Sequence, residues 1–413
     1  MSATIRTDAS TTVTAVTTFT TVTTLTPAAA LTARWHSENG TPPPGRVVLA
    51  DDRLRADTAH HLVSEDTALL WQGDYHGARQ LLSALARRAD REARGSGRRT
   101  ARPATPGEAF REQRRHQARA AGLLGRLVVR LEADHALLLR RAPDVRQACR
   151  EAYGPPDGPR VVALRELLGV LGARQWRERG VHVPALGARV HPHYGVFSPV
   201  RGEYVDLVAR APLPAALGPG TAPGPGTAFD LGTGTGVLAA VLARRGVGRV
   251  LVTDVNPGAL VCARDNARRL GLADRIRPAG TGLYPPGGRR AGLVVCNPPW
   301  LPAEPTSALE QGVYDSGGRM LHGFLDGLAE RLAPGGEGWL VLSDLAEHLG
   351  LRSRADLHSA FAAAGLRVVG RLDARPRHPR ATGATRRTGV RGGDPLGAAR
   401  AAEVTSLWRL APV

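Results

Sequence analysis

The sequence predicts an α/β protein with a parallel sheet in its C-terminal half and a mainly helical N-terminal half. From residue 228 onward, short apolar runs alternate with stretches of helical periodicity, which is the pattern of repeated strand–helix units. Between residues 47 and 180, apolar residues recur mostly at helical spacing. The 413 residues suit two or three domains. We expect a disordered Thr- and Pro-rich tail over 1–46, a helical domain over 47–180 and an α/β domain over 181–413.

The α/β half opens with a strand, a glycine loop and a helix. Residues 228–231 form an apolar run that contains Asp230, residues 232–236 read Gly-Thr-Gly-Thr-Gly, and a helix rich in Ala and Leu follows. Such glycines let the backbone approach a ligand closely, and the helix N-terminus favours an electron-rich group. The next apolar run, 250–253, ends at Asp254. This acid stands 20 residues after Gly234, where a strand-end carboxylate meets ribose hydroxyls in dinucleotide sites.

A second motif, Asn297-Pro298-Pro299-Trp300, follows the apolar run 293–296. Two prolines stop a strand and fix its backbone, so Asn297 is expected at the carboxyl edge of a sheet, where α/β proteins bind ligands. Its amide oxygen and a nearby carbonyl can accept hydrogen bonds from an NH2 group, and Trp300 offers a flat face for stacking. The alternative is that the four residues form only a turn.

The remaining elements complete a sheet of this kind. Helices are predicted over 321–332 and 357–364, and Gly365 ends the second. A strand is predicted over 339–342, and 366–369 and 404–408 read as a closing antiparallel pair. Between that pair lies a long loop, 375–400, that carries many Arg residues. The loop either borders a substrate cleft or is a solvated insertion.

Taken together, the two motifs resemble those of class I S-adenosylmethionine-dependent methyltransferases. The resemblance is to the Asn-Pro-Pro-aromatic branch, the methyltransferase small domain, which includes release-factor glutamine, rRNA guanine-N2 and DNA adenine-N6 methyltransferases. It covers roughly residues 190 to 413. It implies a Rossmann-like seven-stranded sheet with a C-terminal antiparallel strand, S-adenosyl-L-methionine as cofactor, and a macromolecular acceptor, protein or nucleic acid. By this resemblance the catalytic residues are Asn297, Pro298, Pro299 and Trp300, and the cofactor contacts are Asp230, Gly232, Gly234, Gly236, Asp254 and Asn297.

Several points stay open at this level. The family commonly has an acid after its third strand, whereas residues 279–283 contain none, so main chain or Thr281 would have to read adenine. The segment 194–204, with Arg201 and Glu203, resembles the part that lies over the cofactor in this branch. The glycine loop also fits a dinucleotide site, which leaves an NAD-dependent oxidoreductase as an alternative. A catalytically silent RNA- or protein-binding module is the third reading.

The charge of this chain is ambiguous. The formal net charge is +18 from 55 basic and 37 acidic residues, which favours nucleic-acid contact. All basic residues are Arg and none is Lys, a pattern typical of GC-rich coding bias. A nucleic-acid partner and an incidental excess of Arg therefore both remain possible explanations.

The N-terminal half is predicted to be helical, with apolar helix faces over 77–89, 123–131 and 161–171. It either selects the acceptor or caps the catalytic domain. The three cysteines lack the spacing of disulfides or of a zinc site, and His191, His193, His348 and His378 show no metal spacing. No apolar run has the length of a membrane span. We therefore expect a reduced cytoplasmic protein without a metal at its site.

Overall fold

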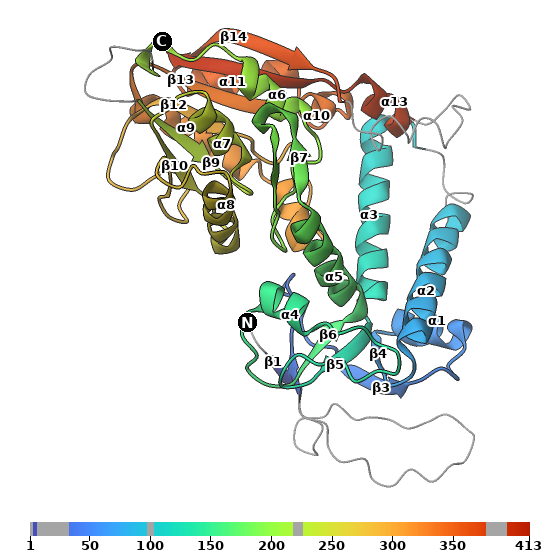
Figure 1. The fold of residues 1–413 in the computed structure, drawn as a ribbon. Coiled ribbons are helices and arrows are strands. Elements are labelled where there is room, and N and C mark those ends of the chain that lie inside the picture. The colour runs from blue at the N-terminus through green and yellow to red at the C-terminus, as the bar shows by residue number, and fades with distance from the viewer. Residues whose placement is uncertain (1–2, 6–32, 97–102, 218–225, 377–394) are drawn as a thin grey trace. The chain divides into compact units, whose positions relative to one another are not determined.

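The computed structural model describes residues 3–5, 33–96, 103–217, 226–376 and 395–413 (Figure 1). The chain divides into two compact units. The first comprises residues 1–102 and 113–175, and the second comprises residues 103–112 and 176–413. Each unit contains a sheet of its own.

The first unit is built on a six-stranded mixed sheet in the order β1-β2-β6-β5-β4-β3. Strands β3, β4 and β5 are mutually parallel neighbours, and β6 is antiparallel to β5. The strands are β1 (Ala3–Ile5), β2 (Ala33–Trp35), β3 (Arg46–Ala50), β4 (Thr67–Trp71), β5 (Leu127–Leu131) and β6 (Arg160–Ala163). The helices are α1 (Ala56–Ser64), α2 (Tyr75–Ser96), α3 (Pro106–Leu124), α4 (Arg146–Tyr153) and α5 (Leu164–Arg179).

The prediction of a mainly helical domain missed this sheet. The helix predicted over 77–89 is confirmed inside α2, but residues 127–131 are strand β5 and not helix. Four of the five β5 residues are fully buried, and a short apolar run that is buried on both faces has no periodicity to separate strand from helix. Strands β1 and β2 also lie inside the tail that was predicted to be disordered, so that prediction is wrong for residues 3–5 and 33–35.

The second unit contains the predicted seven-stranded sheet, in the order β11-β10-β9-β12-β13-β15-β14. Strands β9 to β13 are parallel, and β15 is antiparallel to both β13 and β14. The Rossmann-like architecture with an antiparallel C-terminal strand is thereby confirmed. The strands are β9 (Thr227–Leu231), β10 (Arg249–Thr253), β11 (Ile276–Pro278), β12 (Ala291–Cys296), β13 (Leu332–Ser343), β14 (Leu366–Ala374) and β15 (Thr405–Pro412).

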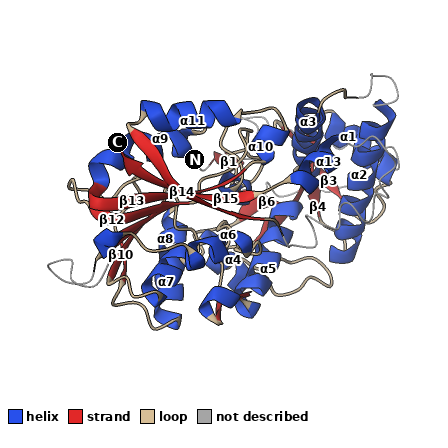
Figure 2. Ribbon diagram, turned by 90° about the horizontal axis from the view of Figure 1, so that it is seen from above, coloured by secondary structure: helices blue, strands red, loops and turns tan. Residues whose placement is uncertain are grey.

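Helices cover both faces of this sheet (Figure 2). One apolar core lies under α6 (Glu203–Arg210), α7 (Val237–Arg244) and α8 (Pro257–Arg269), and a second lies under α9 (Arg319–Arg331) and α11 (Arg354–Ala363). All six residues of β12 are consequently buried, which explains their continuous apolar run. The smaller elements are β7 (Val181–Val183), β8 (Ala188–Val190), α10 (Leu345–His348) and α13 (Pro395–Ala402).

The register of the central strands brings three chain segments to one edge of the sheet. Leu231 of β9 pairs with Thr253 of β10 on one side and with Cys296 of β12 on the other. The residues that follow, Gly232, Asp254 and Asn297, therefore leave the sheet side by side. The two sequence motifs meet here although more than 60 residues separate them.

Two further expectations concern the whole chain. All three cysteines are free and buried, and burial raises the pKa of each thiol, which keeps it protonated. Among the described residues, no helix has the length and apolar character needed to span a membrane. Residues 377–394 of the Arg-rich loop lie outside the described residues.

Candidate functional site

The glycine loop between β9 and α7 has three glycines with left-handed backbone, and the space around them differs. Their φ angles are +67° at Gly232, +53° at Gly234 and +78° at Gly236, a region that side chains avoid. A Cβ on Gly232 would collide with the Met320 side chain, and one on Gly236 would lie 3.0 Å from Ala263 Cβ. A Cβ on Gly234 would meet no atom within 4 Å. Gly234 is therefore the position at which the loop leaves room for a ligand.

Asp254 is held rigidly beside this opening. Its Oδ2 accepts a hydrogen bond from Gly234 N, and its Oδ1 accepts one from Asn256 N, both at 2.9 Å. Burial raises the pKa of the Asp254 carboxyl, and the two backbone hydrogen bonds oppose that rise. Each carboxylate oxygen keeps a free lone pair. The geometry suits an acceptor for ligand hydroxyl groups.

Asp230 lies inside β9 and fastens the glycine loop. It is 1% exposed, and its Oδ2 accepts hydrogen bonds from Thr233 Oγ1 at 2.7 Å and Ala239 N at 3.1 Å. Burial raises the pKa of this carboxyl to about 6, and the Asp254 charge contributes to the rise. Its hydrogen bonds within the described residues go to the loop and to α7, so its contribution to the site is to position the loop.

Asn297 and Trp300 bind each other at the end of β12. The indole Nε1 of Trp300 donates a hydrogen bond to Asn297 Oδ1 at 2.9 Å. An amide oxygen has two lone pairs, so one remains for a substrate donor. The same contact orients the Asn297 amide. Pro298 is buried, while Pro299 is partly exposed.

The Trp300 ring was expected to present a free face, but it already has a partner. The Arg201 guanidinium lies 4.8 Å from the ring centroid, which is cation–π distance. Trp300 also packs against both apolar cores of the sheet. One ring face is therefore used inside the protein, and only the remaining surface can contact an acceptor.

Arg201 belongs to an ion-pair network that the sequence did not reveal. Its Nε donates to Glu203 Oε1 at 2.6 Å, and a terminal nitrogen donates to Glu403 Oε1 at 2.9 Å. Glu403 also accepts from Ser343 Oγ at 2.6 Å. Both glutamates are almost fully buried, and Glu203 Oε2 is a buried oxygen without a hydrogen-bond donor among the described residues. Because 202 residues separate Arg201 from Glu403, no local pattern could have indicated this contact.

The segment before α6 is tied to the glycine loop through α8. Asn266 donates to Thr235 O at 3.0 Å and to His191 O at 3.2 Å, and its Oδ1 accepts from His191 N at 2.8 Å. Asn266 is 2% exposed. This single buried amide therefore holds the chain at His191, just before the predicted covering segment 194–204, beside the loop. Thr281, the residue suggested for adenine, is solvent-exposed in the loop after β11.

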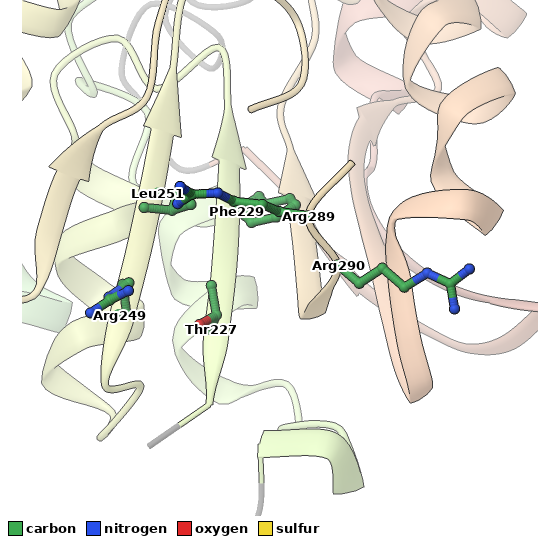
Figure 3. A pocket seen from close by; sticks show the side chains of 6 residues that line it. All are labelled: Thr227, Phe229, Arg249, Leu251, Arg289 and Arg290. Carbon is green, nitrogen blue, oxygen red and sulfur yellow. The ribbon is translucent and has the colours of Figure 1, made fainter. Parts of the chain in front are cut away.

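A separate hollow of about 250 Å³ lies at the opposite end of the same strands (Figure 3). Thr227 and Arg249, the first residues of β9 and β10, contribute to its wall, together with Phe229, Leu251, Arg289 and Arg290. The glycine loop follows the last residue of β9. The hollow is therefore distinct from the edge where the two motifs meet.

Comparison with known proteins supports the resemblance that the motifs indicated. Residues 188–364 match the family model of the methyltransferase small domain. The chain is 41% identical over 118 residues to a release factor glutamine methyltransferase of Moorella thermoacetica, covering 28% of this chain and 42% of that protein. It is 33% identical over 184 residues to a ribosomal protein L11 methyltransferase of Pelotomaculum thermopropionicum, covering 36% and 58%.

The chain thus spans about half the length of these two relatives. A solved ribosomal protein L11 methylase from Lactobacillus delbrueckii subsp. bulgaricus matches 52% of this chain and 82% of its own, with 18% identity and a TM-score of 0.32. A score this low permits no conclusion about function. The family-model match covers β9 to β13 and both motifs. Residues 188–364 of this chain are therefore similar to a methyltransferase small domain.

Proposed function

We propose that the second unit is an S-adenosylmethionine-dependent N-methyltransferase that acts on a planar NH2 group of a macromolecule. The observation that carries the proposal is the register of β10, β9 and β12, which brings Asp254, the glycine loop and Asn297 to one sheet edge. An NAD-dependent oxidoreductase would account for the glycine loop but not for Asn-Pro-Pro-Trp beside it.

The residues at this edge fit S-adenosylmethionine. The open space at Gly234 admits a ligand against the backbone, and Asp254 offers lone pairs to ribose hydroxyls. Glu203 Oε2, which has no hydrogen-bond donor within the part of the chain that the structure describes, is a buried acceptor that suits a cationic or NH-donating part of the ligand. Asp230 acts through the loop that it fastens. When bound, the cofactor would supply a methyl group that is already activated on a sulfonium.

The chain then has to position the acceptor. In the proposed reaction, Asn297 Oδ1 and the Pro298 carbonyl accept hydrogen bonds from the substrate NH2. Those bonds oppose delocalisation of the nitrogen lone pair, which would then be available to attack the activated methyl group. Orientation of reacting groups is worth several kcal/mol in such systems. Trp300 holds the Asn297 amide in the required orientation, and Arg201 supports the Trp300 ring.

A protein acceptor is the finer form of the proposal. The two relatives are named for a release-factor glutamine and for a ribosomal protein, and a glutamine side chain carries the planar NH2 group that Asn297 would orient. A nucleic-acid base carries the same group, and the net charge of +18 is compatible with either class.

The test is methyl transfer from radiolabelled S-adenosylmethionine into cell extract that is fractionated into protein, RNA and DNA. Label in protein that is absent with an Asn297→Ala variant supports the proposal in its finer form. Label in RNA or DNA would instead show that the methyl acceptor is a nucleic acid. Binding of NADH without binding of S-adenosylmethionine, measured by calorimetry, would overturn the proposed function.

A further inference from the structure

Three metal-ligating side chains converge in the first unit, away from the sheet edge described above. His36 and Glu38 follow β2, and Glu166 lies in the first turn of α5. His36 Nε2 is 3.1 Å from Glu38 Oε1 and 3.7 Å from Glu166 Oε1. One ligand atom from each residue lies within 4.8 Å of the other two. This is the only such group of three found among the residues that the structure describes.

Neighbouring groups hold these ligands in place. Glu166 accepts hydrogen bonds from Tyr153 Oη at 3.1 Å and from Glu38 N at 3.3 Å. The His36 ring packs edge-on against the Tyr153 ring, with 4.4 Å between centroids, and its backbone N donates to Val161 O. Hydrogen bonds from surrounding groups that orient the ligands are a regular feature of metal sites. The cluster is therefore organised without an ion.

Within the described residues, the ion pairs of the two carboxylates in this cluster involve no arginine. The ion pairs of Glu38 and Glu166 within the described residues are both to His36. The buried acid Asp74 of the same unit, by contrast, contacts two arginines, Arg140 and Arg141. The Glu166 side chain is only 11% exposed, so its carboxylate has little contact with solvent. A divalent cation would neutralise both carboxylates.

We propose that His36, Glu38 and Glu166 bind a Zn²⁺ ion that fastens the segment after β2 to α5. With metal–ligand bonds of about 2.0–2.2 Å, tetrahedral ligand atoms stand about 3.3 Å apart, close to the spacing seen here. An imidazole nitrogen favours Zn²⁺ over Mg²⁺ or Ca²⁺, which prefer oxygen ligands. Water would supply the fourth ligand. The site is structural, and it is independent of the proposed methyl transfer.

The experiment uses the untagged full-length protein after removal of metal with a chelator. Calorimetric titration with ZnCl2 should show one equivalent bound, and the melting temperature should rise with bound Zn²⁺ because a ligand that binds only the folded state stabilises it. Substitution with Co²⁺ should give the visible absorption of a four-coordinate ion. Titration with MgCl2 should show no comparable binding.

Variants assign the ligands. Glu166→Gln and His36→Ala should each weaken Zn²⁺ binding at least tenfold and abolish the Co²⁺ absorption. The matched control is His61→Ala, which removes the histidine of an exposed His61–Glu65 pair in the same unit and should leave both measurements unchanged. Glu166→Gln could lower stability without any effect on metal binding. In that case the metal-free variant melts at a lower temperature than the metal-free wild type, but its melting temperature rises on addition of Zn²⁺ by as much as that of the wild type.

Two results would overturn the proposal. One is the absence of Zn²⁺ binding by the correctly folded wild-type protein. The other is binding that His36→Ala leaves intact. In either case the cluster is only a network of hydrogen bonds among the three residues and Tyr153.

Discussion

Aspartates lie near the carboxyl edge of the main sheet in each unit, but their hydrogen-bond partners differ. In the first unit, Asp74 follows β4 and accepts hydrogen bonds from Arg141 Nε at 2.6 Å and Arg140 Nε at 3.1 Å. In the second unit, the hydrogen bonds that Asp230 and Asp254 accept within the described residues come from a hydroxyl group and backbone N–H groups. The first edge neutralises its acid with cations, while the second keeps two acids beside neutral donors.

The pKa values follow these environments. The hydrogen bond from Arg141 is the largest cause that lowers the pKa of Asp74, whereas burial raises the pKa of Asp230 and Asp254. The space beside the glycines also differs between the two edges. The Asp52 side chain occupies the space beside Gly77, whereas a Cβ on Gly234 would meet no atom within 4 Å. Acids with shifted pKa values next to open backbone are typical of functional sites. We infer that one edge is closed for stability and the other is open for a ligand.

The sharpest test of this contrast is Asn297→Ala. The variant removes the side-chain acceptor that orients the substrate NH2, an interaction expected to strengthen in the transition state. We expect kcat to fall at least about a hundredfold, as for loss of one preorganised polar group, with a smaller change in KM. Single-turnover methylation measures this effect.

Asp74→Asn is the control from the closed edge. It should retain methylation within about twofold while its melting temperature falls, because it loses a charged hydrogen-bond acceptor for two arginines. Should Asn297→Ala keep most of its single-turnover rate, the planar-nitrogen mechanism is wrong and the motif serves only as a turn.

The two edges should also differ in how pH changes stability. The Asp230 pKa is about 6 in the folded state and about 3.9 when unfolded. As pH rises from about 4 to 6, the unfolded state loses its proton first, so the wild type loses stability relative to Asp230→Asn, by about 2–3 kcal/mol. Asn can keep the accepting oxygen, since one carboxylate oxygen takes both bonds.

Asp74 should show the opposite sign. Its folded pKa is lowered, so its contribution is present above about pH 4 and is lost as pH falls below that value. Urea unfolding at several pH values between 3 and 8 gives both slopes. Parallel slopes for the two variants would refute the contrast between the edges.

Asp254→Ala tests the open edge directly. Loss of a charged hydrogen-bond acceptor should weaken S-adenosylmethionine binding by about 1.5–3 kcal/mol, which calorimetry can measure. Asp254→Asn is the matched control, because its amide oxygen can still accept from Gly234 N. Unchanged affinity in a folded Asp254→Ala variant would remove Asp254 from the proposed cofactor contacts.

The same contrast explains what the sequence could and could not predict. The second sheet was predictable because helices cover both faces of its parallel strands, and its loops carry glycine and proline signals at fixed offsets. In the first unit, β5 and β6 are short apolar runs beside helices, so periodicity alone could not separate strand from helix.

The site was predictable only in part, for a similar reason. Asp254, Gly232 and Asn297 stand directly after strands, so topology alone places them together. The contacts of Arg201 with Glu403 and of His36 with Glu166 join residues far apart in the chain. Such contacts depend on tertiary packing that no local pattern encodes, and the Trp300–Asn297 hydrogen bond depends on a side-chain orientation.

That hydrogen bond gives the smallest and most specific prediction, Trp300→Phe. Phenylalanine keeps a planar ring near Arg201 but cannot donate to Asn297 Oδ1. A neutral hydrogen bond is worth about 0.5–1.5 kcal/mol, so kcat should fall roughly two- to tenfold while cofactor affinity stays unchanged. The kcat of Trp300→Ala should fall further, because this change also removes the ring that packs on both cores. A Trp300→Phe variant with wild-type kcat would show that the indole N–H does not set the Asn297 orientation, and the ring alone would account for the Trp300→Ala defect.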